Sequence, residues 1–254
     1  MRAMILAAGR GLRLEQSDPL PKILLSFGGR TLLARHLEIL DHHGVTQVDI
    51  VVGHRAQDVR DEVARLGAGP MVTFHRNDRY HMGSIISLWT LGAPLLSGEE
   101  VLFMDGDVLY DHRVLAALCD RPEGDYFLMD RKIEEGEDPV RLCFKDGVLV
   151  DFHKRPERPH DWWGEWIGFA RFAAPTARAV FQAADHHMTA GRHDEIYESA
   201  MRDVLLQAAP GAFQEVDVTG LPWVEIDFPE DLRRAQQEVW PRLSSLAALR
   251  RRQG

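Results

Sequence analysis

The sequence predicts an α/β fold, a three-layer sandwich on a mostly parallel sheet with a small β-rich lobe. An apolar stretch of strand length, Met4–Ala7, leads directly into a glycine-containing loop. Strand-length and helix-length apolar patterns then alternate, which is typical of parallel β-α-β units. A later apolar stretch, Val101–Met104, ends in two carboxylates. Because open α/β sheets bind ligands at the carboxyl ends of their strands, we expect a ligand site at this edge.

The individual elements follow from the spacing of apolar residues. Leu33, Leu37 and Leu40 have the spacing of a helix with one buried face over residues 31–43. After residue 111 short β-like runs replace this rhythm, and the Asp146-Gly147 dipeptide between two of them predicts a hairpin. The remaining expectations are strands at 48–52, 71–74, 125–130, 140–144, 148–152 and 224–226, and helices at 56–66 and 175–187 and from about 83, 194 and 229.

Composition bounds the class of protein. The chain has 254 residues, and 30 Lys+Arg against 39 Asp+Glu give a formal net charge of -9, which argues against nucleic acid as a partner. The cysteines, Cys119 and Cys143, lack metal-site spacing, so reduced thiols are expected. No signal peptide is recognisable at the start and no apolar run approaches bilayer length, so we expect a cytoplasmic protein that does not enter a membrane.

The loop after the first strand combines small residues with two cations, Arg13 and Lys22. Glycines let backbone N–H groups approach phosphate oxygens, and the cations neutralise the remaining charge, so the stretch predicts a triphosphate site. It lacks the third glycine of a dinucleotide fingerprint and the Gly-Lys-Ser/Thr of a P-loop. A tight turn after an ordinary strand is the alternative. The expected nucleotide-binding set here is Leu6, Ala7, Ala8, Gly9, Gly11, Arg13 and Lys22.

The carboxylates that follow Val101–Met104 are Asp105 and Asp107. Mg²⁺ prefers one or two carboxylates together with phosphate oxygens and water, so this strand end predicts a metal site beside bound phosphates. Successive strand side chains point to opposite faces, and a bend at Gly106 is needed if both are to reach one site. A cap or turn role for Asp105 is the alternative.

The run LAAGRGLRL with Pro21-Lys22 resembles the signature of nucleotidyltransferases that join a nucleoside monophosphate to a sugar phosphate or a phospho-alcohol. The resemblance implies a Rossmann-like, GT-A-like fold in which the glycine loop, Arg13 and Lys22 hold the nucleoside triphosphate. It also implies that Asp107 binds the metal and Asp105 lies at the nucleotide. A second metal ligand is implied at Asp227, in a Glu-Ile-Asp segment before a helix; alone, Asp227 reads as an N-cap.

A second resemblance, to cytidylyltransferases acting on phosphocholine, rests on Asn77, Tyr80 and the Ser87-Leu88 pair at a helix start. In those relatives this segment lines the nucleotide pocket. The resemblance implies nucleotide contacts from Asn77 and from the helix start near Ser84, where N–H groups face an anion. An ordinary capped helix is the alternative.

The segment Trp162–Phe169 holds three tryptophans around Glu165 and resembles a Gly-Glu-x-Ile-Gly segment of cytidylyltransferases, including those of phosphonate metabolism. Aromatic faces attract a cationic head group and a carboxylate complements its charge, although core packing explains the tryptophans equally well. Acidic residues are common in the first turn of a helix and need no further role. The resemblance to choline-type relatives nevertheless implies that Glu195 and Tyr197 contact the acceptor. The expected acceptor-binding set is Lys154, Trp163, Glu165, Trp166, Glu195 and Tyr197.

Together these patterns predict an Mg²⁺-dependent cytidylyltransferase that moves CMP from CTP to phosphocholine, phosphoethanolamine or 2-aminoethylphosphonate and releases pyrophosphate. Arg13, Lys22, Asp107 and Lys154 are the expected catalytic residues. We expect one domain over 1–254, with a core of 1–120 and 213–240, an acceptor lobe of 121–212 and a tail of 241–254. The tail is expected to be frayed, with a homodimer contact as the alternative. The competing functions are a sugar-1-phosphate nucleotidyltransferase, a dehydrogenase and a non-catalytic nucleotide-binding regulator.

Overall fold

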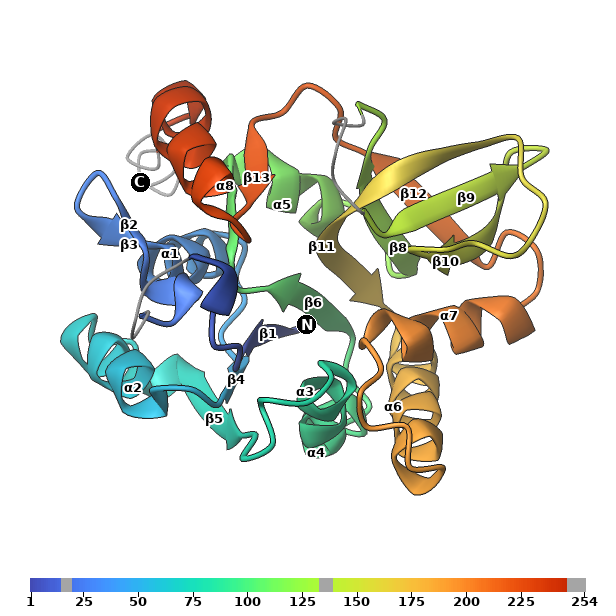
Figure 1. Cartoon of the computed structure of the whole chain (residues 1–254), viewed down its shortest axis with the longest axis horizontal. Helices are drawn as coiled ribbons and strands as arrows, with labels where there is room; N and C mark the ends of the chain where they lie inside the picture. Colours follow the sequence, from blue (N-terminus) through green and yellow to red (C-terminus); the bar gives the residue numbers. More distant parts are fainter. Residues whose placement is uncertain (15–19, 133–138, 246–254) are drawn as a thin grey trace.

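A computed structural model of the protein describes residues 1–14, 20–132 and 139–245. Its centre is a nine-stranded sheet with a main path β10-β9-β11-β6-β1-β4-β5, while β8 joins β11 and β12 joins β8 (Figure 1). The strands are β1 (Arg2–Ala7), β4 (Val48–Val52), β5 (Val72–Arg76), β6 (Val101–Asp105), β8 (Asp125–Asp130), β9 (Arg141–Lys145), β10 (Val148–His153), β11 (Trp162–Phe172) and β12 (Phe213–Asp217).

One half of the sheet is parallel, as the alternating pattern predicts. β1 lies between β4 and β6, and β4 pairs with β5, all in parallel. The crossovers are helical, because apolar residues recur at helical spacing between these strands. These helices are α1 (Leu32–His42), α2 (Ala56–Arg65), α3 (Ile85–Thr90) and the single turn α4 (Gly92–Leu95). The parallel arrangement brings the ends of β1 and β6 together at one edge.

The other half is mainly antiparallel and is organised by β11, which pairs with β6, β8 and β9, while β12 pairs with β8 in parallel. β9 and β10 form the expected hairpin, and Asp146 and Gly147 at its turn have φ values of 51° and 77°, as a primed turn requires. The β-rich region therefore extends the central sheet. Two short pairs lie outside this sheet: β2 (Ser26–Phe27) with β3 (Arg30–Thr31), and β7 (Val108–Tyr110) with β13 (Trp223–Glu225).

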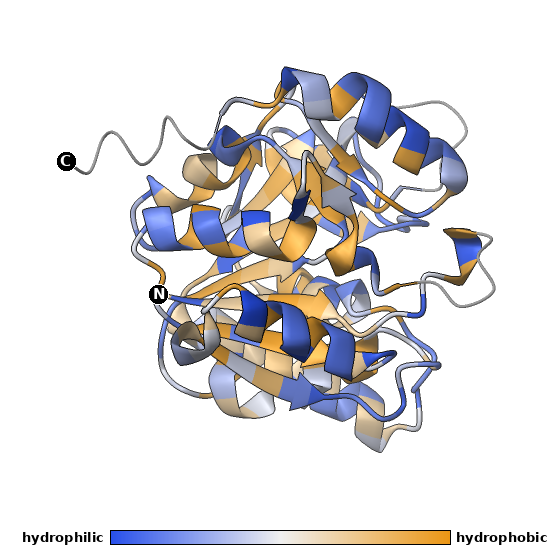
Figure 2. Cartoon of the chain, turned by 90° about the vertical axis from the view of Figure 1, so that its left-hand side faces the viewer, coloured by the Kyte–Doolittle hydropathy of each residue, from blue (hydrophilic) through white to orange (hydrophobic). Residues whose placement is uncertain are grey.

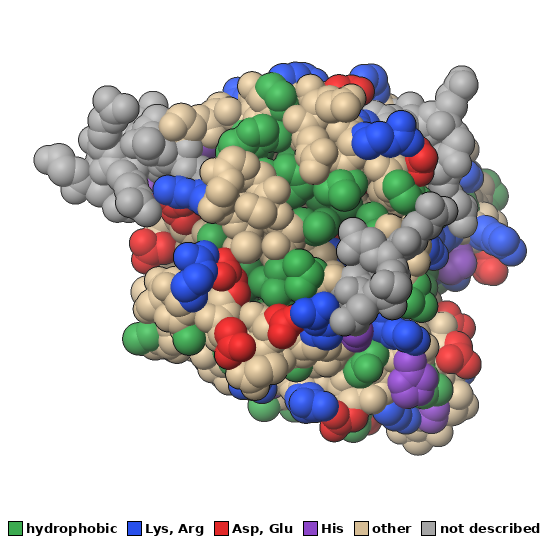
Figure 3. Space-filling view, turned by 60° about the vertical axis from the view of Figure 1, so that its left-hand side comes forward, with side chains coloured by type: hydrophobic (Ala, Val, Ile, Leu, Met, Phe, Trp, Pro, Cys, Tyr) green, Lys and Arg blue, Asp and Glu red, His purple; other side chains and the backbone are tan. Residues whose placement is uncertain are grey.

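Helices cover both faces of the sheet, which makes the fold a three-layer sandwich as predicted. One hydrophobic core lies under α1, α2 and α5 (His112–Cys119) and the turn Ala235–Val239 that continues α8 (Pro229–Arg234). A second core lies under α3, α6 (Ala174–Thr189) and α7 (Glu198–Gln207). The strands are predominantly hydrophobic, and the helices around them are hydrophilic on their outer sides (Figure 2). Among the described residues of the face in Figure 3, acidic and basic side chains are interspersed.

The helix expected from Asp194 begins instead at Glu198. Tertiary contacts hold the preceding residues: the carbonyl of His193 accepts from Gly83 N, and that of Glu195 accepts from Ile85 N. Both cysteines are free thiols, as expected. In the described ranges no helix combines the length and the apolarity that crossing a bilayer requires. Residues 246–254 of the predicted tail lie outside the described residues.

Candidate active site

The glycine loop turns away from the end of β1 and lies against Lys22. Gly11 has a φ of +59°, which side chains rarely adopt, and a Cβ there would lie 3.3 Å from Cγ of Lys22. A 3₁₀ turn at Leu12–Leu14 follows and carries Arg13, and a second one at Lys22–Leu24 carries Lys22. Glycine thus allows the loop and the lysine stem to pack closely.

Asp107 lies in the turn between β6 and β7. At Gly106 a Cβ would lie 2.8 Å from the carbonyl oxygen of Leu6, so only glycine lets this turn approach the end of β1 closely. The carbonyl of Gly106 also faces Nε2 of the buried His36 at 3.2 Å. Burial lowers the pKa of His36 to about 4, so the imidazole is neutral and can donate one hydrogen bond there. The bend that the sequence requires at Gly106 is present.

Asp227 comes from far along the chain and reaches Asp107 through pairing of β13 with β7. Glu225 lies opposite Val108, and the N–H of Ile226 donates to the carbonyl of Asp107 at 3.1 Å. The alternative N-cap role for Asp227 is wrong. The carboxylate of Asp231 instead accepts from the N–H groups of residues 227 and 228 at the start of α8, at 2.9 and 2.7 Å. The Asp227 side chain is thereby left to the site.

Two cations meet these carboxylates. Nζ of Lys22 lies 2.8 Å from Oδ2 of Asp107 and also contacts Oδ1 of Asp227, while Arg13 reaches Oδ2 of Asp227 at 2.9 Å. Burial opposes charge on Lys22, but the two carboxylates outweigh it and raise its pKa above the usual range. Burial would likewise raise the pKa of Asp227, but Lys22, Arg13 and Lys154 lower it. Lys22 is therefore a fixed cation between two carboxylates.

A third carboxylate, Glu225, completes an acidic cluster. One oxygen each of Asp107, Glu225 and Asp227 lies within 4.8 Å of the others. Glu225 and Asp227 are two residues apart in an extended segment and therefore point the same way. Hard carboxylate oxygens at this spacing suit Mg²⁺, and Asp107 and Asp227 already hold one cation, the Lys22 ammonium, between them. The residues present thus fit a divalent ion.

A cavity of about 310 Å³ opens beside this cluster, at the lower end of the range for small-ligand sites. Of the expected nucleotide and metal residues it is lined by Leu6, Ala7, Gly9, Gly11, Arg13, Lys22, Asp107 and Asp227. Tyr80 and His81 form another part of its wall, and their participation was not predicted beyond the resemblance at Tyr80. The structure therefore brings together the two ends of the predicted site.

Of the expected nucleotide residues, Ala8, Asn77, Ser84 and Asp105 are not among those that line this cavity. Ala8 is buried beneath the loop. The amide of the buried Asn77 donates to Ser87 Oγ at 3.0 Å and accepts from the N–H of Arg79 at 2.9 Å. The hydroxyl of Ser84 accepts from the N–H of Tyr197 at 2.9 Å. The polar groups of Asn77 and Ser84 thus bind the protein's own backbone and side chains.

Asp105 belongs to a chain of hydrogen bonds with two expected acceptor residues. Trp166 Nε1 donates to the hydroxyl of Tyr197 at 3.2 Å, and that hydroxyl donates to Oδ2 of Asp105 at 2.5 Å. Burial, and then the charges of Asp107 and its neighbours, raise the pKa of Asp105. Gly168 makes the contact possible, since a Cβ there would lie 2.8 Å from Oδ2 of Asp105. Asp105 therefore contacts Tyr197 and is not among the residues that line the cavity.

Glu198, the first residue of α7, was not predicted as a site residue. It is 8% exposed, and its Oε2 has no hydrogen-bond partner. Burial raises its pKa to about 7, and the charge of Lys154 opposes this rise. The charge of Glu198 also raises the pKa of Asp105, although burial and the charges of Asp107 and Glu225 contribute more to this rise. Glu198 and Lys154 therefore lie near enough to Asp105 and to the acidic cluster to influence their charges.

The aromatic segment is strand β11, and its tryptophans already bind the protein's own cations. Arg131 lies 4.4 Å from the ring centre of Trp162, and Arg141 lies 4.6 Å from that of Trp163. Trp166 is buried in the second core. The structure thus favours the packing alternative for this cluster over a free aromatic box.

The remaining two expected acceptor residues, Glu165 and Glu195, do not join the cluster. Glu165 lines a separate cavity of about 110 Å³ with Trp223 and Arg234. Glu195 accepts from the hydroxyl of Ser199 at 3.0 Å. Both assignments remain predictions from resemblance.

Three comparisons place this geometry among known proteins. The model of a family described as the MobA-like NTP transferase domain matches residues 3–158. The CMP-5'-(3-aminopropyl)phosphonate synthase of Streptomyces rubellomurinus is 29% identical over 251 residues, which cover 95% of this chain and 39% of that protein. The bifunctional IPC transferase and DIPP synthase of Rubrobacter xylanophilus is 28% identical over 241 residues, covering 93% of this chain and 51% of that protein. The chain thus spans about half or less of the length of these relatives.

A solved structure has the same fold. The CTP:phosphocholine cytidylyltransferase from Streptococcus pneumoniae superposes with a TM-score of 0.71 at 21% identity, covering 93% of this chain and 97% of that one.

Proposed function

Because the chain belongs to the MobA-like NTP transferase domain family and is a nucleotidyltransferase, we propose that it transfers CMP from CTP to a small acceptor that carries both a phosphate or phosphonate and an amine. The observation that carries this proposal is the joint position of the glycine-lined cavity, the Asp107–Asp227 cluster and the Lys154–Glu198 pair at one sheet edge. The similarity to a CMP-aminopropylphosphonate synthase over almost the whole chain supports cytidine and an amino-phosphonate acceptor.

The reaction is one in-line displacement. An anionic oxygen of the acceptor attacks the α-phosphorus of CTP, a new phosphorus–oxygen bond forms, and the bond to the bridging oxygen breaks so that pyrophosphate leaves with its electron pair. No proton has to be removed from the nucleophile, because the phosphate or phosphonate is ionised near neutral pH. Catalysis then consists of positioning and neutralisation of charge.

The residues of the chain divide these tasks. The glycine loop offers backbone N–H groups to the triphosphate, and Arg13 and Lys22 neutralise its charge. Asp107 and Asp227, with Glu225 beside them, would hold Mg²⁺. The ion would supply positive charge to phosphate oxygens during displacement. Lys154 is assigned to the anionic end of the acceptor, because its charge reaches both Asp227 and Glu198.

Glu198 is assigned to the amine of the acceptor. A buried carboxylate with an unpaired oxygen is costly unless a cation or donor reaches it. An ammonium group would satisfy this oxygen, and a neutral hydroxyl would do so less strongly because charged hydrogen bonds are the stronger ones. A zwitterionic acceptor with its anion at Lys154 and its ammonium at Glu198 therefore matches the charges of the site.

Pyrophosphate release tests the proposal directly. The purified chain is assayed with each of four nucleoside triphosphates against 2-aminoethylphosphonate, 3-aminopropylphosphonate, phosphoethanolamine, phosphocholine and hexose 1-phosphates, with and without Mg²⁺. We expect the highest kcat/KM with CTP and an amine-bearing acceptor. Preference for a hexose 1-phosphate would replace the proposed acceptor, and absence of turnover with every pair would refute the function.

Replacing Glu198 by glutamine is expected to raise the KM for an aminoalkylphosphonate by about tenfold to a hundredfold, because a charged hydrogen bond to the ammonium is lost. The KM for CTP should not change. The control is Asp203→Asn on the same helix, whose carboxylate pairs with His187. An alkylphosphonate without an amine serves as the second control acceptor, and equal KM changes for it and for the amine would contradict the assignment.

Glu198 also predicts a pH dependence of stability without ligands. Its folded pKa of about 7 lies above the ordinary 4.5, so the folded protein binds more protons than the unfolded one between these values. The free energy of unfolding should therefore fall as pH rises through this window, by about 3 kcal/mol from this group. Glu198→Gln removes the effect, so its stability relative to the wild type should increase from pH 4.5 to 7 and stay constant above. Denaturant unfolding of both proteins across this range measures the difference, and parallel curves would contradict it.

A further inference from the structure

The segment that carries Lys154 leaves β10 through a bulge. The β10–β9 register shifts between Leu149 and Asp151, so Val150 is the extra residue. Its carbonyl accepts from Nη1 of Arg158 at 3.5 Å, and Nη2 of the same guanidinium reaches the carbonyl of Leu206 on α7 at 3.4 Å. The bulge thus contributes to a link between this loop and α7.

Asp151, completely buried, is the centre of the link. Its Oδ1 accepts from the N–H of Phe152 at 2.9 Å, and its Oδ2 accepts from the N–H groups of Glu157 and Arg158 at 2.8 and 3.0 Å. The carboxylate therefore closes residues 152–158 into a hydrogen-bonded loop, and Lys154 is one of the residues of this loop. The backbone donors leave residue 154 little freedom to move relative to β10.

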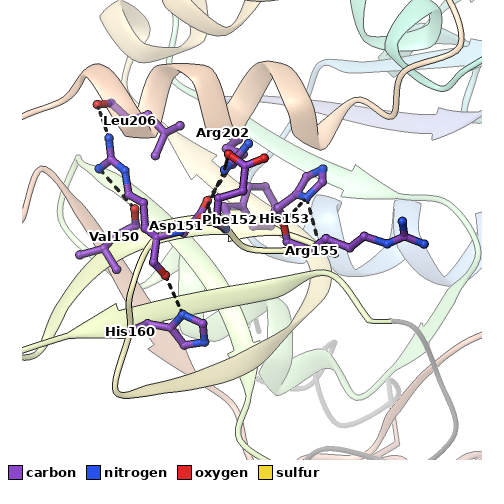
Figure 4. A network of polar contacts seen from close by, with 10 residues as sticks. Val150, Asp151, Phe152, His153, Arg155, His160, Arg202 and Leu206 are labelled. Atoms are coloured by element: carbon purple, nitrogen blue, oxygen red, sulfur yellow. Dashed lines mark hydrogen bonds and ion pairs between the residues drawn. The ribbon is translucent and has the colours of Figure 1, made fainter.

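Arg202 joins this loop to α7. Its Nε lies 2.7 Å from Oδ1 of Asp151, its Nη2 lies 3.3 Å from Oδ2, and its side chain is only 15% exposed. Figure 4 shows the two side chains pointing toward one another between the end of β10 and the helix. Arg202 follows Glu198 by four residues, so both lie on one face of α7. One face of the helix thus carries Glu198, which is assigned to the amine, and Arg202, which holds the loop of Lys154.

We propose that Asp151 and Arg202 are positioning residues that set the separation between Lys154 and Glu198, and through it the length of zwitterionic acceptor that the enzyme accepts. This inference rests on the proposed function. A buried, geometrically matched Arg–carboxylate pair holds its partners in one geometry, whereas a hydrogen bond to a neutral amide would allow the loop to shift. With a shifted loop, an acceptor whose charged ends are one methylene further apart would bind as well as the acceptor that the wild type prefers.

The experiment compares 2-aminoethylphosphonate and 3-aminopropylphosphonate with Asp151→Asn and Arg202→Gln. We expect either change to raise the KM of the better of these two acceptors about tenfold or more, to reduce the preference between them, and to leave the KM for CTP within about twofold. In a Lys154→Ala background, Asp151→Asn should add little, because it acts through Lys154.

Arg171→Gln is the matched control. Arg171 is 8% exposed on its side chain, pairs with Glu100 at 2.7 Å and donates to three main-chain carbonyls, but it lies at the far end of β11. Its loss should lower the Tm by about as much as Asp151→Asn, by several degrees, without changing the acceptor preference.

Two results would overturn the inference alone, provided that the wild type turns over normally. The first is an acceptor preference that Asp151→Asn leaves unchanged. The second is a double variant in which the KM changes of Asp151→Asn and Lys154→Ala simply add. Absence of turnover by the unchanged chain would overturn the proposed function and the inference together. Hydrogen exchange at the amides of Glu157 and Arg158 reports on the loop without turnover, and we expect lost protection there in both positioning variants. Retained protection would also overturn it.

Discussion

Asp107→Ala is expected to lower kcat for pyrophosphate release by about a thousandfold or more, because the triphosphate would lose the divalent ion that we propose to neutralise it. The carboxylate lies in a turn and its backbone is held by Ile226 N and by neighbouring strands, so its removal should leave the fold intact. Only its ion pair with Lys22, at 2.8 Å, is lost. Pyrophosphate release at saturating CTP and Mg²⁺ measures the effect, and circular dichroism checks the fold.

Metal binding gives this prediction a second readout. Mn²⁺ titration of the protein should show a weaker site in Asp107→Ala and in Asp227→Ala, since both carboxylates belong to the cluster. Asp61→Asn, an exposed carboxylate on α2 that accepts from Gln57, serves as the control and should bind the ion like the wild type. Turnover of Asp107→Ala near the wild-type rate would remove the metal assignment.

The parallel half of the fold was predictable because its signals are local. Leu33, Leu37 and Leu40 face the core from α1, and β4 is buried along its whole length and apolar except for Asp49, as expected of a strand covered on both faces. The Asp146-Gly147 turn was equally predictable, since the dipeptide tolerates the positive φ values that the hairpin requires. In each case the residues within one element determine its conformation.

The strand β11 shows where local patterns leave alternatives open. Trp162–Phe169 is rich in the aromatic residues that strands favour, and its composition left ligand binding and core packing as equal alternatives. In the structure Trp166 fills the second core, and Arg131 and Arg141 cover faces of its neighbours. Arg131 precedes β11 by thirty-one residues, and no local pattern indicates that the two will meet.

The acidic cluster and Glu198 also separate what local patterns predict from what packing decides. Glu225 and Asp227 alternate along a strand, so their common face follows from the sequence. The approach of Asp227 to Asp107 was expected only through the family resemblance, and the participation of Glu225 was not predicted. Glu198 was predicted as part of a helix and had no visible role. Its burial follows from how α7 packs near Asp105 and Lys154, three elements that are distant in sequence. Sequence patterns identify which side chains share a face, and packing decides which face becomes the site.

Lys22→Ala is the second large effect that we expect, a loss of about a hundredfold to a thousandfold in kcat/KM for CTP. The Lys22 side chain is 15% exposed, and the contacts of its ammonium group with Asp107 and Asp227 hold it in the wall of the cavity beside the glycine loop. Without it the β- and γ-phosphates lose a fixed cation. The KM for the acceptor should change much less, because Lys154 and not Lys22 is assigned to that end of the site.

The same variant should show the opposite change in metal binding. In the wild type, Lys22 would compete with a divalent ion for the two carboxylates. Its removal should therefore make Mn²⁺ bind at least as tightly as in the wild type while turnover falls. Asp107→Ala, by contrast, should weaken Mn²⁺ binding and reduce turnover. Lys145→Ala, an exposed lysine next to the β9–β10 turn, controls for the loss of one positive charge. If Lys22→Ala weakened Mn²⁺ binding and left the KM for CTP unchanged, the lysine would have to be reassigned from the triphosphate to support of the acidic cluster.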